Sequence, residues 1–140
     1  MSIEELEHTA DLRFRIRAPT LEGLFAEAVR ALMETLFGNS DGPAIAGTRT
    51  VEVSAADRES LLHDLLSEIL YRSETENLVF SDTEISLADG PPLSVRAELR
   101  ATPFDPARHS GGTEVKGIAY FDLAIVEADD EFCLEIVFDV

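Results

Sequence analysis

Along the sequence, segments with an apolar residue at every second position alternate with segments in which apolar residues recur every three or four positions. This order of strand-like and helix-like segments limits the folds that the chain can adopt. Residues 12–18 place an apolar side chain at every second position, with Arg13, Arg15 and Arg17 between them. This pattern predicts a strand with one buried face and one basic face. Residues 21–36 then repeat apolar side chains at spacings of three and four, after Thr20 as a helix cap and before Gly38 as a stop. That segment predicts an amphipathic helix of four to five turns.

The rest of the chain predicts one further helix and mostly strands. Asp57 is a good N-cap for a helix whose apolar stripe runs from position 61 to position 70. Strands are expected at 49–54, 78–87, 93–100, 115–128 and 132–140, with an irregularity inside 78–87 or a split into two. Turn-forming residues mark loops at 39–47 and 102–112, a break at 90–92, and a hairpin turn at Asp129 and Asp130.

Because the strands gather in the second half, the order favours an α+β fold over a doubly wound parallel sheet. We expect a single domain over residues 1–140, with a mixed β-sheet and two amphipathic helices packed on one side of it. A length of 140 residues with 45% hydrophobic residues is enough for a real core.

The charge balance is strongly acidic. Asp and Glu number 28 against 11 Lys and Arg, so the formal net charge is −17. Such a surface repels phosphate backbones and anionic lipid, and it favours cations and basic protein partners. The sequence has no 18-residue apolar run, and its first residues lack the apolar core of a signal peptide. We therefore expect a cytoplasmic protein with no membrane and no direct nucleic-acid contact.

Three of the eleven basic residues share the exposed face of the strand at 12–18. We expect Arg13, Arg15 and Arg17 to pair with carboxylates of the chain, and contact with a partner is the alternative.

Metal chemistry, if present, should use oxygen ligands. Cys133 is the only cysteine and the three histidines are scattered, which excludes a cysteine-based zinc cluster and an internal disulfide framework. His63 has no second His or Cys four residues away, so we interpret it as a partly exposed helix residue. No phosphate-binding glycine loop, nucleophile elbow or EF-hand sequence occurs. A Ca²⁺ or Mg²⁺ site would have to be assembled from distant segments.

Three places combine polar groups in a way that invites a functional interpretation. Residues 7–11 are a polar cluster before the first strand, although such residues also satisfy nearby backbone N–H groups. Asp139 and the carboxylate of Val140 sit one residue apart at the end of an apolar strand. If buried, they would need a cation or hydrogen-bond donors, and if exposed they would be hydrated at the strand end. Lys116 is the only basic residue from position 111 to 140, and a solvated edge lysine or a salt-bridge partner is the alternative.

These places also belong to a wider resemblance. In order and spacing along nearly the whole chain, the sequence resembles the archease family, accessory proteins of the GTP-dependent tRNA-splicing RNA ligase. The matching segments are His8-Thr9-Ala10-Asp11, Leu21-Glu22-Gly23-Leu24-Phe25, Val51-Glu52-Val53 with Asp57, residues 61–71, Leu78-Val79-Phe80, Asp105-Pro106 with His109, Glu114-Val115-Lys116 and Val137-Phe138-Asp139-Val140.

The resemblance implies a function and a site. It implies a divalent-metal site of Asp11, Asp139 and Val140, the last through its backbone or terminal carboxylate, for Ca²⁺ with Mg²⁺ or Mn²⁺ as alternatives. It also implies that Lys116, with Asp11 and Asp139, takes part in activating the ligase. The chain would then be no catalyst itself, but would promote guanylylation and multiple turnover of the ligase in tRNA splicing or RNA repair.

The sequence departs from the family pattern at Glu7, Ala101, Thr102, Ala119 and Phe121. These departures leave the three carboxyl positions and the lysine intact. Two other functions remain open from the residues: a stand-alone divalent-metal-dependent phosphoester-processing enzyme, and a chaperone-like acidic interaction module.

Overall fold

A computed structural model describes residues 11–39, 47–120 and 123–140. The expected cluster at 7–11 therefore lies outside the described residues except for Asp11, and so do most of the loop at 39–47 and the departure at Phe121. The two helices and seven strands follow in the order β1 (Asp11–Ala18), α1 (Leu21–Phe37), β2 (Gly47–Ala55), α2 (Arg58–Glu76), β3 (Leu78–Ala88), β4 (Leu93–Pro103), β5 (Gly117–Ile118), β6 (Ile125–Ala128) and β7 (Glu131–Asp139).

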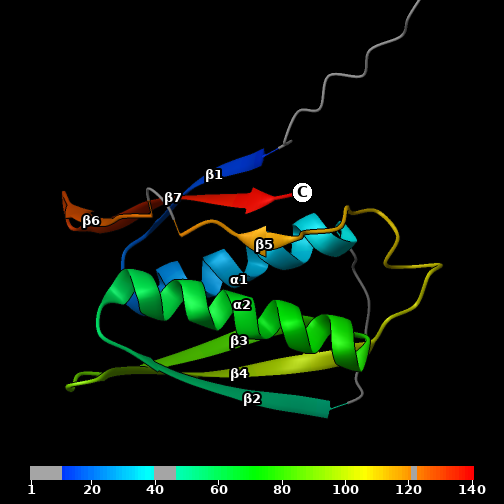
Figure 1. Cartoon of the computed structure of the whole chain (residues 1–140), viewed down its shortest axis with the longest axis horizontal. Helices are drawn as coiled ribbons and strands as arrows, with labels where there is room; N and C mark the ends of the chain where they lie inside the picture. Colours follow the sequence, from blue (N-terminus) through cyan, green and yellow to red (C-terminus); the bar gives the residue numbers. More distant parts are fainter. Residues whose placement is uncertain (1–10, 40–46, 121–122) are drawn as a thin grey trace, which may run out of the picture.

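The strands form two sheets, and both helices lie between them (Figure 1). Sheet A has the order β1-β7-β5, with β6 also paired to β7, and sheet B has the order β2-β4-β3. Every strand pair in the described chain is antiparallel. Helix α1 packs against β1 and β3, and α2 packs against β2, β4 and β5. The α+β prediction is confirmed. The predicted single mixed sheet is wrong, because the described strands form two antiparallel sheets, and the helices lie between these sheets instead of on one side of a single sheet.

Each helix begins and ends where local chemistry dictates. The Thr20 side chain accepts a hydrogen bond from the Gly23 N–H at 3.0 Å, and α1 ends at Gly38, whose φ is 74°. The Asp57 carboxylate accepts from the Ser60 N–H at 2.7 Å, and this hydrogen bond lowers the pKa of Asp57. Both predicted N-caps and the predicted stop of α1 are confirmed.

The two-sheet arrangement explains the width of the apolar helix faces. A helix covered on two sides must bury more of its circumference than a helix resting on one sheet. Helix α2 accordingly buries adjacent pairs of residues in successive turns. Its buried residues are Leu61, Leu62, Leu65, Leu66, Ile69, Leu70 and Ser73. The core lies along the two helices and receives the inward side chains of both sheets.

Most predicted strands are confirmed, but one is wrong. Strand β3 is a single strand with a register shift between Ser81 and Glu84, so the predicted irregularity is present. The predicted strand at 115–128 is instead interrupted: β5 has two residues, and the chain rejoins the sheet as β6. After β5 the Ala119 N–H still donates to the Val137 carbonyl oxygen of β7, and the Tyr120 hydroxyl then lies 2.9 Å from Oγ of Ser60 on α2. The hairpin turn at 129–130 is confirmed, and Asp129 and Asp130 both have positive φ.

Neither helix of the described chain is long and apolar enough to cross a membrane.

Candidate functional site

Sheet A brings together the two aspartates that the sequence places more than 120 positions apart. In the antiparallel pairing of β1 with β7, Asp11 lies directly opposite Asp139. Directly opposite residues point to the same face of a sheet, with Cβ atoms about 4.5–5.5 Å apart. Figure 1 shows the start of β1, the end of β7 and β5 side by side. We call Asp11 and Asp139 the carboxylate pair.

Gly117 completes this cross-strand row on the other side of β7. It is the register partner of Asp139 in the β5–β7 pairing. A Cβ atom at Gly117 would lie 4.0 Å from Oδ2 of Asp139, so the glycine places no side chain between β5 and that carboxylate. Asp11 is exposed and Asp139 is half-buried, which leaves the row open to a ligand from outside.

Lys116 is attached to the same row through its backbone. Its N–H donates to the carbonyl oxygen of Asp139 at 2.7 Å. The Lys116 side chain is exposed, and Val140, which follows Asp139, is half-buried. The structure therefore places all four residues singled out in the sequence at one end of sheet A.

The loop that leads from β4 to Lys116 is held against the end of α1. The Thr113 N–H donates to the carbonyl oxygen of Thr35 at 2.7 Å. Gly112 passes so close that a Cβ there would lie 2.2 Å from the carbonyl oxygen of Leu36. Only glycine permits this approach, so the path of the chain toward Lys116 depends on it.

His109 anchors the same loop. It is buried, its Nδ1 accepts a hydrogen bond from the Asp105 N–H at 2.9 Å, and its ring packs against Phe37 and Phe104. Burial lowers the pKa of His109, and the charge of Arg108 lowers it further. The neutral imidazole of His109 accepts this hydrogen bond at Nδ1 and therefore has a structural role in the loop.

Helix α2 holds β5 from the inner side through contacts that sequence reasoning missed. Nε2 of His63 lies 3.0 Å from the carbonyl oxygen of Ile118, and the Tyr120 hydroxyl lies 2.9 Å from Oγ of Ser60. Glu59 accepts a hydrogen bond from the Ile125 N–H at 2.9 Å. His63 is partly exposed, as expected, yet it fixes the strand next to the carboxylate pair. His63 and Ile118 are 55 positions apart in the sequence, so no local sequence signal reveals this contact.

This end of sheet A offers the carboxylate oxygens of the carboxylate pair, and the exposed side chain of Lys116 begins at the same end. Carboxylate and carbonyl oxygens are the ligands that Ca²⁺ and Mg²⁺ take in proteins. In residues 11–39, 47–120 and 123–140, no three His, Cys, Asp or Glu side chains are gathered. A cation held by the carboxylate pair and an oxygen of Val140 would keep positions for water or for a ligand from a partner.

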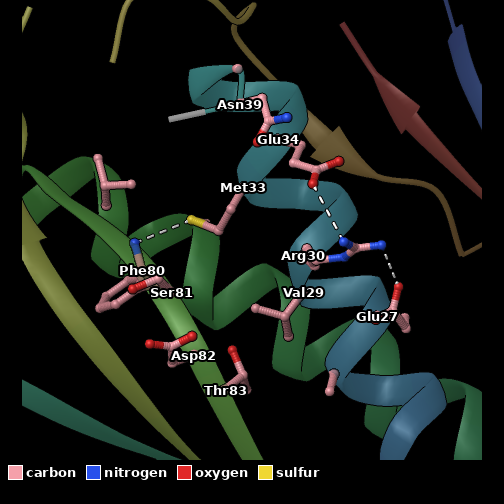
Figure 2. Close-up of a pocket in the computed structure, with 13 residues that line it drawn as sticks. Glu27, Val29, Arg30, Met33, Glu34, Asn39, Phe80, Ser81, Asp82 and Thr83 are labelled. Carbon is pink, nitrogen blue, oxygen red and sulfur yellow. Dashed lines mark hydrogen bonds and ion pairs between the residues drawn. The ribbon is translucent and has the colours of Figure 1, made fainter. Parts of the chain in front are cut away.

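A second candidate is the groove between α1 and β3, which has a volume of about 440 Å³ (Figure 2). Three of its charged groups are engaged with one another, because Arg30 lies 2.9 Å from Glu27 and 3.9 Å from Glu34. On its floor the Phe80 N–H donates to the sulfur of Met33 at 3.4 Å. Among the described residues that line this groove, no hydrogen bond joins a carboxylate to a hydroxyl group.

Comparisons with known proteins agree on one family. Residues 3–140 match the model of the Archease protein family. Protein archease of Methanopyrus kandleri is 38% identical over 143 residues, covering 100% of both chains. Protein archease of Pyrococcus furiosus is 35% identical over 129 residues, covering 91% of this chain and 89% of its own.

Two solved structures share the fold. A protein of Methanobacterium thermoautotrophicum, solved in solution, superposes with a TM-score of 0.77 at 24% identity, over 96% of each chain. A crystal structure from Thermotoga maritima, described as an archease and possible chaperone, superposes with a TM-score of 0.66 at 19% identity. It covers 100% of this chain and 98% of its own.

Proposed function

Because the chain belongs to the archease family, we propose that it is an accessory protein that activates a GTP-dependent RNA ligase. It promotes guanylylation and multiple turnover of that ligase in tRNA splicing or RNA repair, in the cytoplasm, without being the catalyst. The observation that carries this proposal is the pairing of Asp11 with Asp139, with the backbone of Lys116 bonded to Asp139.

The carboxylate pair supports a divalent-metal site. Asp11 and Asp139 carry two like charges on opposite positions of one strand pair, which is unfavourable without a cation between them. Together with an oxygen of Val140 they would hold Ca²⁺, with Mg²⁺ or Mn²⁺ as alternatives. A bound cation would supply positive charge for the phosphates in a guanylyl transfer, as in phosphoryl transfer generally.

Besides the proposed cation, the ammonium group of Lys116 would give the site a second positive charge. Its exposed ammonium lies on a flexible stem, while its backbone is fixed to Asp139. A lysine acts as a mobile point charge, which suits contact with a nucleotide phosphate or with a carboxylate of the ligase. Substitution of Lys116 should therefore affect activation more than metal binding.

The charge of the rest of the molecule fits an accessory role. A protein of net charge −17 does not compete with the ligase for RNA, because phosphate backbones repel it. Its acidic surface favours a protein partner with basic regions.

The test is a guanylylation assay with the purified cognate RNA ligase, GTP and a divalent metal. We expect the unmodified protein to stimulate ligase guanylylation and turnover, and Asp11→Asn, Asp139→Asn and Lys116→Ala to stimulate poorly. Glu131→Gln, which removes a carboxylate from the same face of β7, is the matched control and should stimulate fully. Absence of stimulation by the unmodified protein overturns the proposal, and turnover of GTP by the isolated protein would favour a stand-alone enzyme. Equal binding to unrelated basic proteins would favour a general acidic interaction module.

A further inference from the structure

Strand β1 lies at an edge of sheet A. It pairs with β7 along all eight of its residues, and no described strand pairs with its other side. A sheet edge presents a row of backbone N–H and C=O groups that can pair with another chain. Figure 1 shows β1 as the outermost strand of this sheet.

A groove follows this edge. It has a volume of about 420 Å³ and lies between β1 and the exposed side of α1. Its walls combine apolar and charged side chains. Phe14 and Ala31 are half-buried and Ile16 is buried, while α1 contributes Glu27, Arg30 and Glu34. A strand added to a sheet edge lies about 4.8 Å from its neighbour, so an incoming strand would place its inward side chains over this groove.

The outer face of β1 carries the arginine stripe of Arg13, Arg15 and Arg17. Arg15 already illustrates what this face binds, because its Nη2 lies 2.6 Å from Oε1 of Glu135 on the neighbouring strand. No carboxylate of the described residues lies within ion-pair distance of Arg13 or Arg17, so these two guanidinium groups can take partners from outside.

We propose that an extended acidic segment of the partner ligase adds to β1 as a further strand of sheet A. Its carboxylates would alternate along the outer face opposite the arginine stripe, and its smaller apolar side chains would face the groove. Backbone hydrogen bonds give such strand addition its affinity, and the alternating side chains give it specificity. This inference rests on the proposed function for the identity of the partner.

A second copy of this chain does not suit the edge. Pairing β1 with another β1 would set the arginine stripe of one copy beside that of the other, and like charges on opposite positions are destabilising. The same arginines therefore oppose self-association and favour an acidic strand.

The location of the edge connects it to the candidate metal site. Asp11, the first residue of β1, belongs to the carboxylate pair and shares the outer face with the arginine stripe. A segment bound along β1 would thus run to the end of sheet A where Lys116 lies. Docking and activation would occupy adjoining parts of one surface.

The experiment measures ligase binding and hydrogen exchange on the same complex. The variant is Arg13→Glu with Arg17→Glu, which reverses the outer charge at two positions four residues apart. The control is Arg96→Glu with Arg100→Glu, which reverses two exposed arginines at the same spacing on β4 of sheet B. Affinity for the purified ligase and amide exchange of residues 11–18 are followed, together with guanylylation.

We expect the β1 variant to bind the ligase at least tenfold more weakly and the control to bind like the unmodified protein. We also expect β1 amides to become protected in the complex with the unmodified protein. Unchanged affinity of the β1 variant, or no added protection in β1, overturns this inference while ligase stimulation by the unmodified protein leaves the proposed function standing. If the unmodified protein neither binds nor stimulates the ligase, the proposed function itself is wrong.

Discussion

Removing one charge from the carboxylate pair should stabilise the metal-free protein. Asp11 and Asp139 are direct register partners, so their carboxylates repel each other when no cation is bound. For charges about 6 Å apart, Coulomb's law gives about 0.7 kcal/mol in bulk water and about 3 kcal/mol at an effective dielectric constant of about 20. Because Asp11 is exposed and Asp139 half-buried, we expect Asp139→Asn to gain about 1 kcal/mol.

The assay is thermal unfolding with and without metal. With about 2.1 cal/mol/K of unfolding entropy per residue, a gain of about 1 kcal/mol in a chain of 140 residues raises Tm by about 3 °C. Calcium at 100 times its Kd should stabilise the unmodified protein by about 2.7 kcal/mol, and Asp139→Asn should lose most of this gain. The order of stability of the two proteins thus reverses when calcium replaces EDTA.

Glu131→Gln is the control, because it also removes one acid from the outer face of β7 but faces no acidic register partner. The reasoning is refuted if Asp139→Asn and Glu131→Gln have the same Tm in EDTA. It is also refuted if the advantage of Asp139→Asn persists in 1 M salt, where the screening length of about 3 Å should abolish the repulsion.

Three further outcomes follow from contacts described above. Burial holds the pKa of His109 below its unfolded value, so on acidification the unfolded chain binds a proton before the folded chain does. The stability that comes from the neutral His109 is complete above about pH 6.5 and is lost as the pH falls. In urea unfolding, His109→Gln should therefore flatten the decline in the free energy of unfolding between pH 7.5 and 5.5. Gly112→Ala would set a Cβ against the Leu36 carbonyl, so guanylylation assays should show weakened stimulation with a native circular dichroism spectrum; an unchanged stimulation would mean that the loop path does not matter to Lys116. Thr20→Ala should cost about 1 kcal/mol in urea unfolding because the Gly23 N–H loses its cap, while Thr20→Ser should cost much less.

Local patterns predicted most of the elements because the signals that start and stop them are local. Thr20 and Asp57 cap their helices with their own side chains, and the alternation around the arginine stripe directly gives the buried face of β1. The division into two sheets was not predictable in this way. Alternation shows that one face of a strand is buried, but it does not show which layer covers that face.

The candidate site was partly predictable for a related reason. Family resemblance singled out Asp11, Asp139, Val140 and Lys116, and the register of β1 with β7 brings the first two together. The contacts of His63 and Tyr120 with their neighbours join residues about 55–60 positions apart. They depend on where β5 ends, which alternation misjudged by continuing a strand through residues 119–120 and 123–124. Whether the four residues bind metal or activate a ligase stays a prediction for the assays above.

The pairing of β1 with β7 also bears on how the protein is made. Strand β1 ends at Ala18, yet its hydrogen-bonding partner begins only at Glu131. Sheet B and α2 can assemble from neighbouring segments, whereas sheet A has to wait for the synthesis of β7, as long-range strand pairing generally does. A product truncated before β7 would contain only one of the two facing carboxylates. The carboxylate pair therefore forms only in a chain that has been synthesised through β7.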